Sequence, residues 1–261
     1  MIELPELSRV EPRGDGPFGL LLFLPPSGDR GLPQRLAAHG KLRAAYRIEL
    51  PVVGEPRYPV QWLSILEFRD RAAWDAAMRT AGSVDARGLV VTPWKPAVRA
   101  LLPITLKLRA LAGIDESVGA PPESLPSSPH NPTLERFREF AYPRPAFGGS
   151  VEFAADDRGP PVMLNLLKYA RTATVNGETL SGKRAYLRYG RVAIAHVASL
   201  GGTIEWMGDP PRGSDWDSVA LVRYPSRQHF VRMVSRAHYQ AALPYRDAAL
   251  ESTALWAMSR R

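Results

Sequence analysis

The sequence predicts an α+β fold in which two βαββαβ units follow one another in a single chain of 261 residues. Three observations support this prediction. Apolar strand-like and helix-like segments alternate in the order βαββαβ after Pro160. The residues before about position 100 repeat the same order more loosely. A local match at a constant spacing of 156 residues, Phe68–Trp74 with Tyr224–Phe230, links the two halves.

The second half has the clearer pattern. The first helix of this half is expected to begin near Lys183 and to end at Gly201 and Gly202. Ser226 is expected to cap a second helix. Pro244 is expected to interrupt the helical segment after Val234. The expected elements are a strand at 161–169, a helix at 183–200, strands at 203–208 and 217–224, a helix at 226–234 and a strand at 252–259. This order is that of the ferredoxin-like split unit.

The first half gives the same kinds of element. Its expected elements are strands at 18–25, 44–52, 60–68 and 88–96, with helices at 32–42 and 71–82. Between the halves, 97–113 reads as a short basic amphipathic helix, 116–132 as a Pro/Ser-rich linker, and Asn131 as the cap of a helix to 141.

These patterns divide the chain into a ferredoxin-like unit at 1–100, a helical and Pro/Ser-rich linker at 101–150, and a second unit at 151–261. We expect the two tandem ferredoxin-like βαββαβ units to pack sheet to sheet as an intrachain α/β barrel. The protein would then be a monomer with an internal pseudo-dimer. A homodimer that forms through the second unit is the alternative.

Composition excludes several classes of function. The chain has no cysteine, which excludes disulfides and thiolate sites and is compatible with the cytoplasm. No apolar run is long enough to span a membrane, and we expect no export signal. The net charge of +8 is spread over both halves, so nucleic acid is not expected as a partner.

Five ordered motifs of the second half resemble one known family. They are "MLNLLKY", "YLRYG", "AHVASLGG", "DSVALVRYPSRQHF" and "ALPYRDAALE". Over about residues 160–259 the chain is similar to domain of unknown function 1330, in the dimeric α/β-barrel superfamily. One segment departs from the family pattern, because "RAHY", Arg236–Tyr239, stands where relatives tend to have an acidic "DPEY".

The resemblance implies a scaffold that carries different chemistries. The superfamily includes cofactor-independent monooxygenases of aromatic polyketides, lactone isomerases, haem-degrading enzymes and haem-containing chlorite dismutases. Where its members have a site, the site usually lies between the outer face of the sheet and the helices. The family itself brings no assigned reaction, so fold cannot stand in for function.

Two residues are the candidate catalytic groups. His196 lies on one face of its helix with Tyr189, where it is either a general base or a core histidine bonded to the backbone. Asn165 shares a strand face with Met163 and Leu167, where its amide either holds a substrate oxygen or bonds to a neighbouring loop. We expect His196 to be buried on the side of Asn165, with a polar partner on at least one nitrogen.

Further side chains are candidates for substrate binding. Arg223 either clamps a carboxylate or reaches solvent at a strand end, and Trp206 either stacks on a ligand or packs in the core. Tyr189 either positions His196 or packs against it. Tyr239 and Arg246 are candidates for the mouth of a pocket.

No motif names a reaction. The sequence lacks the phosphate-loop, dinucleotide, zinc-protease and hydrolase signatures, and its histidines show no spacing typical of a metal site. We therefore expect no cofactor, although one inward histidine can suffice as an axial haem ligand. The first hypothesis is a cofactor-independent oxygenase or isomerase/cyclase acting on a small aromatic or lactone-like substrate. The alternative is a non-catalytic small-molecule-binding or scaffold protein on the same fold.

Overall fold

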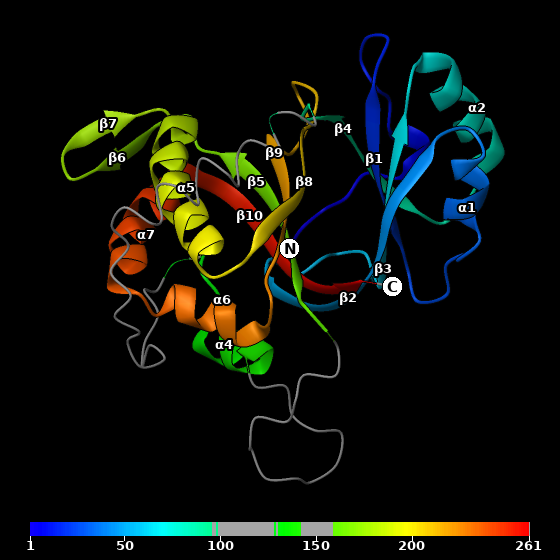
Figure 1. Ribbon diagram of the computed structural model, residues 1–261. Coiled ribbons are helices and arrows are strands. Elements are labelled where there is room, and N and C mark those ends of the chain that lie inside the picture. The colour runs from blue at the N-terminus through cyan, green and yellow to red at the C-terminus, as the bar shows by residue number, and fades with distance from the viewer. Residues whose placement is uncertain (96–97, 99–127, 129, 142–158, 261) are drawn as a thin grey trace, which may run out of the picture.

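The computed structural model describes residues 1–95, 98, 128, 130–141 and 159–260. Eight antiparallel strands close into one barrel in the order β1-β3-β2-β10-β5-β9-β8-β4. Helices cover the barrel on two opposite sides: α1 and α2 lie against the first half, and α4 to α7 against the second (Figure 1). The fold is therefore α+β with a closed eight-stranded barrel, as the sequence predicts at this level.

The elements follow the predicted order closely. The barrel strands are β1 (Phe18–Leu24), β2 (Lys41–Val53), β3 (Trp62–Phe68), β4 (Arg87–Pro93), β5 (Val162–Tyr169), β8 (Thr203–Asp209), β9 (Ser218–Arg223) and β10 (Leu250–Arg260). The α-helices of the described residues are α1 (Leu32–Ala37), α2 (Arg71–Ala81), α4 (Leu134–Ala141), α5 (Gly182–Ser199), α6 (Arg227–Val234) and α7 (Ala237–Ala249). A short 3-10 helix spans Leu7–Arg9. None of the described helices is long and apolar enough to cross a membrane.

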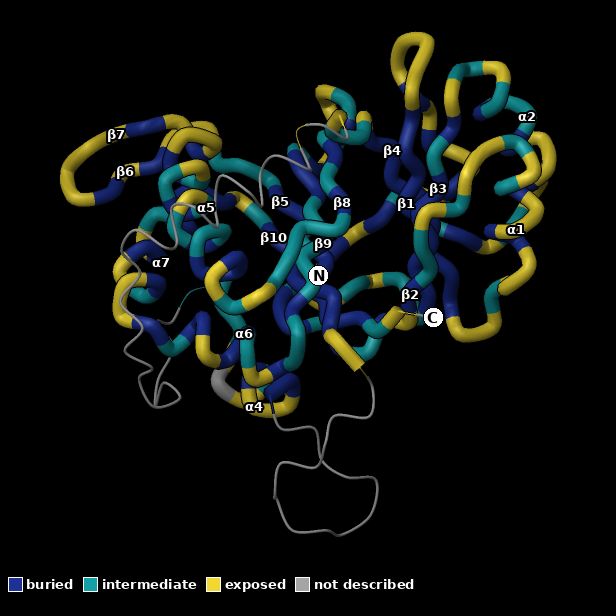
Figure 2. Tube along the Cα trace, in the orientation of Figure 1, coloured by how far each residue is buried: buried dark blue, intermediate teal, exposed yellow. Residues whose placement is uncertain are grey.

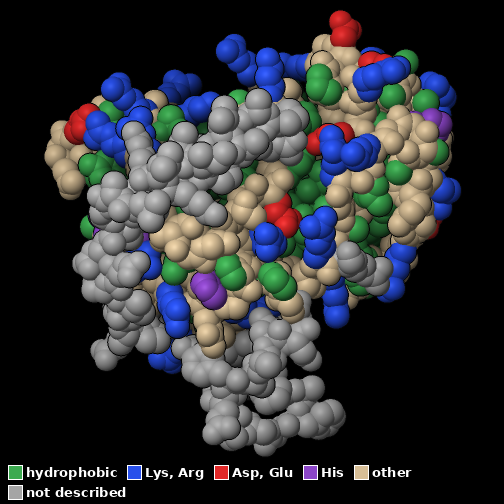
Figure 3. Space-filling view, viewed as in Figure 1, with side chains coloured by type: hydrophobic (Ala, Val, Ile, Leu, Met, Phe, Trp, Pro, Cys, Tyr) green, Lys and Arg blue, Asp and Glu red, His purple; other side chains and the backbone are tan. Residues whose placement is uncertain are grey.

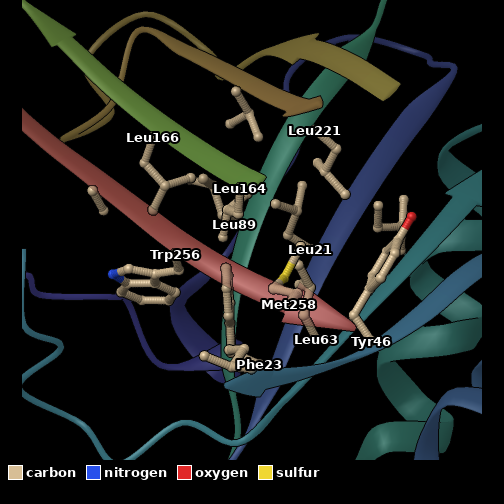
Figure 4. Packing of buried hydrophobic residues seen from close by; sticks show 14 of the residues in the cluster. Leu21, Phe23, Tyr46, Leu63, Leu89, Leu164, Leu166, Leu221, Trp256 and Met258 are labelled. Carbon is tan, nitrogen blue, oxygen red and sulfur yellow. The ribbon is translucent and has the colours of Figure 1, made fainter. Parts of the chain in front are cut away.

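Inward-facing side chains from both halves fill the barrel. On β5, Leu164 and Leu166 point inward, and on β10 Trp256 and Met258 do the same. They meet Phe23 and other side chains of the first half (Figure 4). The Trp256 ring is fully buried, contacts Phe23 edge to face at 5.9 Å between centroids, and donates through Nε1 to the Gly54 carbonyl. The interior of this barrel is a packed core.

The outer faces of the strands carry the helices. In the first half Leu20 and Leu22 of β1 pack with Trp74 of α2. In the second half Met163 of β5 packs with side chains of α5 and α7. Every residue of β1 is buried because both of its faces are covered, whereas the helices expose their outer sides (Figure 2).

The two halves meet edge to edge. A long seam pairs β2 with β10, from Val53–Leu255 to Tyr46–Arg260, and a short seam pairs β4 with β8. The sequence predicts sheets packed face to face. The structure adds hydrogen-bonded seams at both edges, which leave no edge of the barrel unpaired.

A buried ion pair ties the long seam to two helices. Arg227, the first residue of α6, binds the Glu49 carboxylate of β2, and only 4% and 10% of these side chains are exposed. The Arg227 guanidinium also lies 4.8 Å from the centre of the Phe140 ring and donates to the Phe140 carbonyl of α4. One arginine therefore joins the first half, the second half and the helix between them.

The structure corrects four local expectations. Residues 173–180, for which no element is expected, form a hairpin of β6 (Ala173–Val175) and β7 (Glu178–Leu180) with Asn176 and Gly177 at positive φ. Helix α7 continues through Pro244, because its buried face packs against α5. Thr133, rather than Asn131, caps α4 by accepting from the Arg136 amide.

The fourth correction concerns the matched helix starts. Asp70 accepts from the amide of Ala73, as a cap does, but the Ser226 hydroxyl contacts His229 Nδ1 instead of capping α6. The expected basic helix at 97–113 and most of the Pro/Ser-rich linker lie outside the described residues.

Candidate functional site

Helix α5 positions the candidate histidine. The helix starts at the cap Ser181, whose hydroxyl accepts from the Arg184 amide, and it ends where Gly201 takes a positive φ. Tyr189 and His196 lie two turns apart on its buried face, and His196 has no exposed surface. The structure confirms the predicted burial of His196.

A hydrogen bond between helices defines the tautomer of His196. Arg236, the residue before α7, lies with its Nη1 3.0 Å from His196 Nδ1. Because a guanidinium only donates, Nδ1 must accept, and the proton of the neutral imidazole lies on Nε2. Nε2 is buried and has no hydrogen-bond partner among the described residues. His196 therefore presents an unpaired N–H donor.

Arg236 is itself buried, with 5% of its surface exposed. Its Nη1 also donates to Ser199 Oγ at 2.9 Å, near the end of α5. Its Nε is buried and unpartnered within the described part of the chain. This arginine lies in the segment "RAHY", which differs from the acidic segment of the family that the sequence resembles, and the structure places it directly against His196.

The surroundings of His196 disfavour its protonated form. Burial, followed by the positive charge of Arg236 and the neighbouring His238, lowers the pKa of His196 from 6.5 to about 4. The His238 ring lies 5.5 Å from the His196 ring between centroids and is exposed on its other side. His196 is therefore neutral at physiological pH.

Tyrosines continue the site along α5 and α7. The hydroxyls of Tyr189 and Tyr239 are hydrogen-bonded at 2.7 Å, and the Tyr239 ring lies 6.2 Å from His196. Tyr186 packs against Tyr189, and Tyr169 of β5 packs against Tyr186, each pair with centroids 5.4 Å apart. Burial raises the pKa of Tyr239 well above its usual value, so its phenol stays protonated.

Asn165 lies on the outer face of β5, on the predicted side. Its Nδ2 donates to the Met163 carbonyl at 3.2 Å and reaches the Ala220 carbonyl of β9 at 3.5 Å. Both partners are carbonyls of strands rather than of the neighbouring loop that the structural alternative expects. A contact between Asn165 and a substrate stays a prediction.

Two predicted binding residues lie on the other side of the sheet. Trp206 is buried inside the barrel and donates through Nε1 to Glu67 at 3.0 Å. Arg223 pairs with Glu205 at 3.1 Å, and Glu205 also accepts from the Tyr46 hydroxyl at 2.7 Å. The position of Trp206 matches the alternative in which it packs in the core, on the face of the sheet away from His196. A contact of Trp206 or Arg223 with a substrate stays a prediction.

Arg246 is buried rather than placed at a pocket mouth. It lies two turns after Tyr239 on α7 and donates to the His130 carbonyl and, at 2.9 Å, to Asn131 Oδ1. Its Nη1 is also 4.0 Å from Asp247. Arg246 therefore ties α7 to the segment before α4, at the tyrosine end of the site.

Two described cavities lie away from this cluster, in the first half. One of about 300 Å³ is lined by Trp74 and Met78 of α2, and one of about 500 Å³ by His39 and Arg43. Among the described residues, no group of three or more His, Asp or Glu side chains is placed to hold a metal ion. Lys and Arg side chains are spread over the visible face (Figure 3).

Arg236, Ser199 and His238 complete the cluster, and sequence reasoning assigned none of them a role. A charged residue at a junction between helices shows no periodicity that predicts burial. The departure "RAHY" was the one available signal, since it marks a reversed charge at Arg236.

No protein-family model matches the chain, and no curated protein matches it either. Solved structures do show similarity. A Rhodopseudomonas palustris protein of unknown function is 32% identical, with 50% of this chain and 95% of that chain covered and a TM-score of 0.41. A chlorite dismutase from Candidatus Nitrospira defluvii in complex with imidazole is 11% identical over 94% of this chain and 92% of that chain, with a TM-score of 0.47. An anthrone oxidase-like protein is 12% identical over 94% and 90%, with a TM-score of 0.42.

Proposed function

We propose that this protein is a cofactor-independent enzyme, an oxygenase or an isomerase/cyclase, that acts on a small aromatic or lactone-like substrate. Its site lies between the outer face of β5 and helices α5 and α7. The observation that carries the proposal is the buried Nε2–H donor of His196, which has no acceptor among the described residues. Nearly all buried donors are paired, and the exceptions are often functional.

The proposed role of His196 differs from the general base that the sequence suggests. Arg236 occupies the lone pair on Nδ1, and the proton occupies Nε2, so the neutral ring has no free lone pair with which to accept a proton. A neutral imidazole N–H can instead stabilise negative charge that develops on a substrate oxygen. The hydroxyls of Tyr189 and Tyr239 are hydrogen-bonded to each other, so one hydroxyl of the pair keeps a proton that it can donate.

The same geometry does not fit a haem ligand. A histidine that binds iron through Nε2 normally donates its Nδ1 proton to a carbonyl or carboxylate. At His196 the partner of Nδ1 is the Arg236 guanidinium, which forces Nδ1 to accept. No step of the proposed reaction therefore passes through haem.

A non-catalytic small-molecule-binding or scaffold protein is the second candidate. His196 has no exposed surface, and neither of the two described cavities includes it. This burial supports a role in which the histidine only holds α5 and α7 together.

Turnover measurements test the enzyme proposal. Purified protein is incubated in air with a panel of small phenols and lactones, without added cofactor, and products are detected by mass spectrometry. We expect conversion of at least one compound, and loss of roughly 100-fold or more in kcat for His196→Leu, which has no side-chain donor, since that is the usual cost of one lost donor to an oxyanion. The matched control is His229→Leu, on α6, which should retain activity.

One outcome would contradict the enzyme and favour the binding protein. That outcome is an inert panel combined with release of an unmodified small molecule from freshly purified protein.

We also propose that the two halves are tandem ferredoxin-like units, one at 1–100 and one at 151–261, joined by the linker at 101–150. The strand order β4-β1-β3-β2 in the first half matches β10-β5-β9-β8 in the second, which supports the repeat. The same proposal includes three further statements. The protein is a monomer with an internal pseudo-dimer, it is located in the cytoplasm, and it belongs to the family of domain of unknown function 1330.

A further inference from the structure

The His196–Arg236 pair holds two buried N–H donors without acceptors in the described part of the chain. They are Nε2 of His196 and Nε of Arg236. One hydrogen bond of 3.0 Å joins the two side chains, so both donors belong to a single cluster. Ordinary packing does not account for two such donors side by side, because buried polar groups are nearly always paired.

A comparison of the buried arginines shows what is unusual about Arg236. Three arginines of the described residues are buried, and two of them lie within ion-pair distance of a carboxylate: Arg227 of Glu49, and Arg246 of Asp247. Among the described residues, the Arg236 side chain hydrogen-bonds to the neutral groups of His196 and Ser199, and no described carboxylate is within ion-pair distance. Buried charges are normally paired, so this site has an uncompensated positive charge.

The helix ends around Arg236 do not remove this charge. The ends of α5, at Ser199, and of α6, at Val234, each contribute about half a negative charge, and the start of α7, at Ala237, contributes about half a positive one. Together they offset about half of a unit charge and leave the rest of the guanidinium charge in excess. The Arg236 side chain does not cap α7, because it points to α5.

The guanidinium has an edge available for a ligand. Nη1 makes both of its protein hydrogen bonds, whereas Nε makes none within the described residues. The Nε side of a guanidinium can receive a carboxylate in a planar arrangement. Ser199 and His238, which contact this pair, are exposed, so the pair lies just below the surface.

We infer that the His196–Arg236 pair binds the anionic oxygen of a small organic acid, a carboxylate or a phenolate. The anion would supply the charge that Arg236 lacks and accept from both unpaired donors. This inference rests on the proposed function, because it names the class of substrate that the site would take.

Calorimetric titration of the full chain with benzoate and with benzamide tests the inference. The two probes share a ring and differ in charge at the acceptor group. We expect benzoate to bind at least about tenfold more tightly than benzamide. 4-Nitrophenol serves as the phenolate probe, and its visible absorbance reports whether the bound form is the anion. Preference for benzoate or for the nitrophenolate identifies which anionic oxygen the site accepts.

Variants assign the preference to Arg236. Arg236→Gln, which removes the charge, should lose the preference for benzoate, whereas Arg236→Lys should keep part of it. Arg232 is an exposed arginine of α6 outside the site. Arg232→Gln removes one positive charge there and should keep the full preference for benzoate. Circular dichroism of each variant confirms that it is folded.

Three results would overturn the inference. The first is equal affinity for benzoate and benzamide together with no binding of the nitrophenolate anion. The second is unchanged affinity for the preferred anion in folded Arg236→Gln, and the third is no binding of benzoate or of 4-nitrophenol at millimolar concentration. Failure of the enzyme proposal looks different. Anion binding without turnover of any compound would support the anion site and refute the enzyme proposal. Turnover of neutral lactones without a preference for anions would support the enzyme proposal and refute the anion site.

Discussion

Arg227→Met is expected to lower the free energy of unfolding by about 3 to 5 kcal/mol, the usual cost of removing one partner of a buried ion pair. The substitution removes the guanidinium that the buried Glu49 carboxylate binds. It also removes the contact of that guanidinium with Phe140 of α4. Urea denaturation followed by circular dichroism measures the change.

Two control variants separate the causes. The double variant Glu49→Leu with Arg227→Met removes both charges and should recover most of the loss, because apolar side chains often replace a buried pair without cost. Arg232→Gln, on the exposed face of α6, should change stability little. A loss below about 1 kcal/mol in Arg227→Met would show that the pair does not hold the seam.

Acidification is expected to destabilise the protein through His196 by roughly 3 kcal/mol between pH 6.5 and about 4. In the unfolded chain the imidazole binds its proton near pH 6.5, and in the folded chain burial and Arg236 hold its pKa at about 4. Between these values the unfolded chain binds more protons, so stability falls as pH falls. The contribution is fully present above pH 6.5, and below about pH 4 it is lost.

The measurement compares the unfolding free energy of the wild type with that of His196→Gln across this range. Other groups with lowered pKa, such as Asp70 and His130, also titrate in acid, and the difference between the two proteins cancels them. The difference should shrink by about 1.4 kcal/mol per pH unit within the window. A difference that stays constant with pH would contradict a depressed pKa at His196.

The sequence predicts most of the fold because local patterns determine it. Strand alternation placed Met163 and Asn165 on one face of their strand, and the structure has both on the outer face of β5. Gly201 and Gly202 predicted the end of α5, and Gly201 takes a positive φ there. The continuation of α7 through Pro244 was missed because packing against α5 outweighs one lost backbone hydrogen bond.

The candidate site was predicted only in part, for physical reasons. Helical spacing brings Tyr189 and His196 to one face, but the bond from Arg236 spans 40 residues and no local pattern predicts it. The alternation of side chains along a strand does not show which face of the sheet lies inside the barrel, so it could not place Trp206. A bulge between Ile204 and Trp206 also breaks the alternation in β8.

The central claim, that His196 is a neutral donor held by Arg236, is tested most directly by nitrogen-15 NMR of histidine-labelled protein. The account predicts that the His196 proton lies on Nε2, that Nδ1 is unprotonated, and that neither signal titrates from about pH 8 to about pH 5. In Arg236→Gln the pKa of His196 should rise, because the neighbouring positive charge is gone. A proton on Nδ1, or titration of His196 at the ordinary value of 6.5, would contradict the donor assignment and restore the general base.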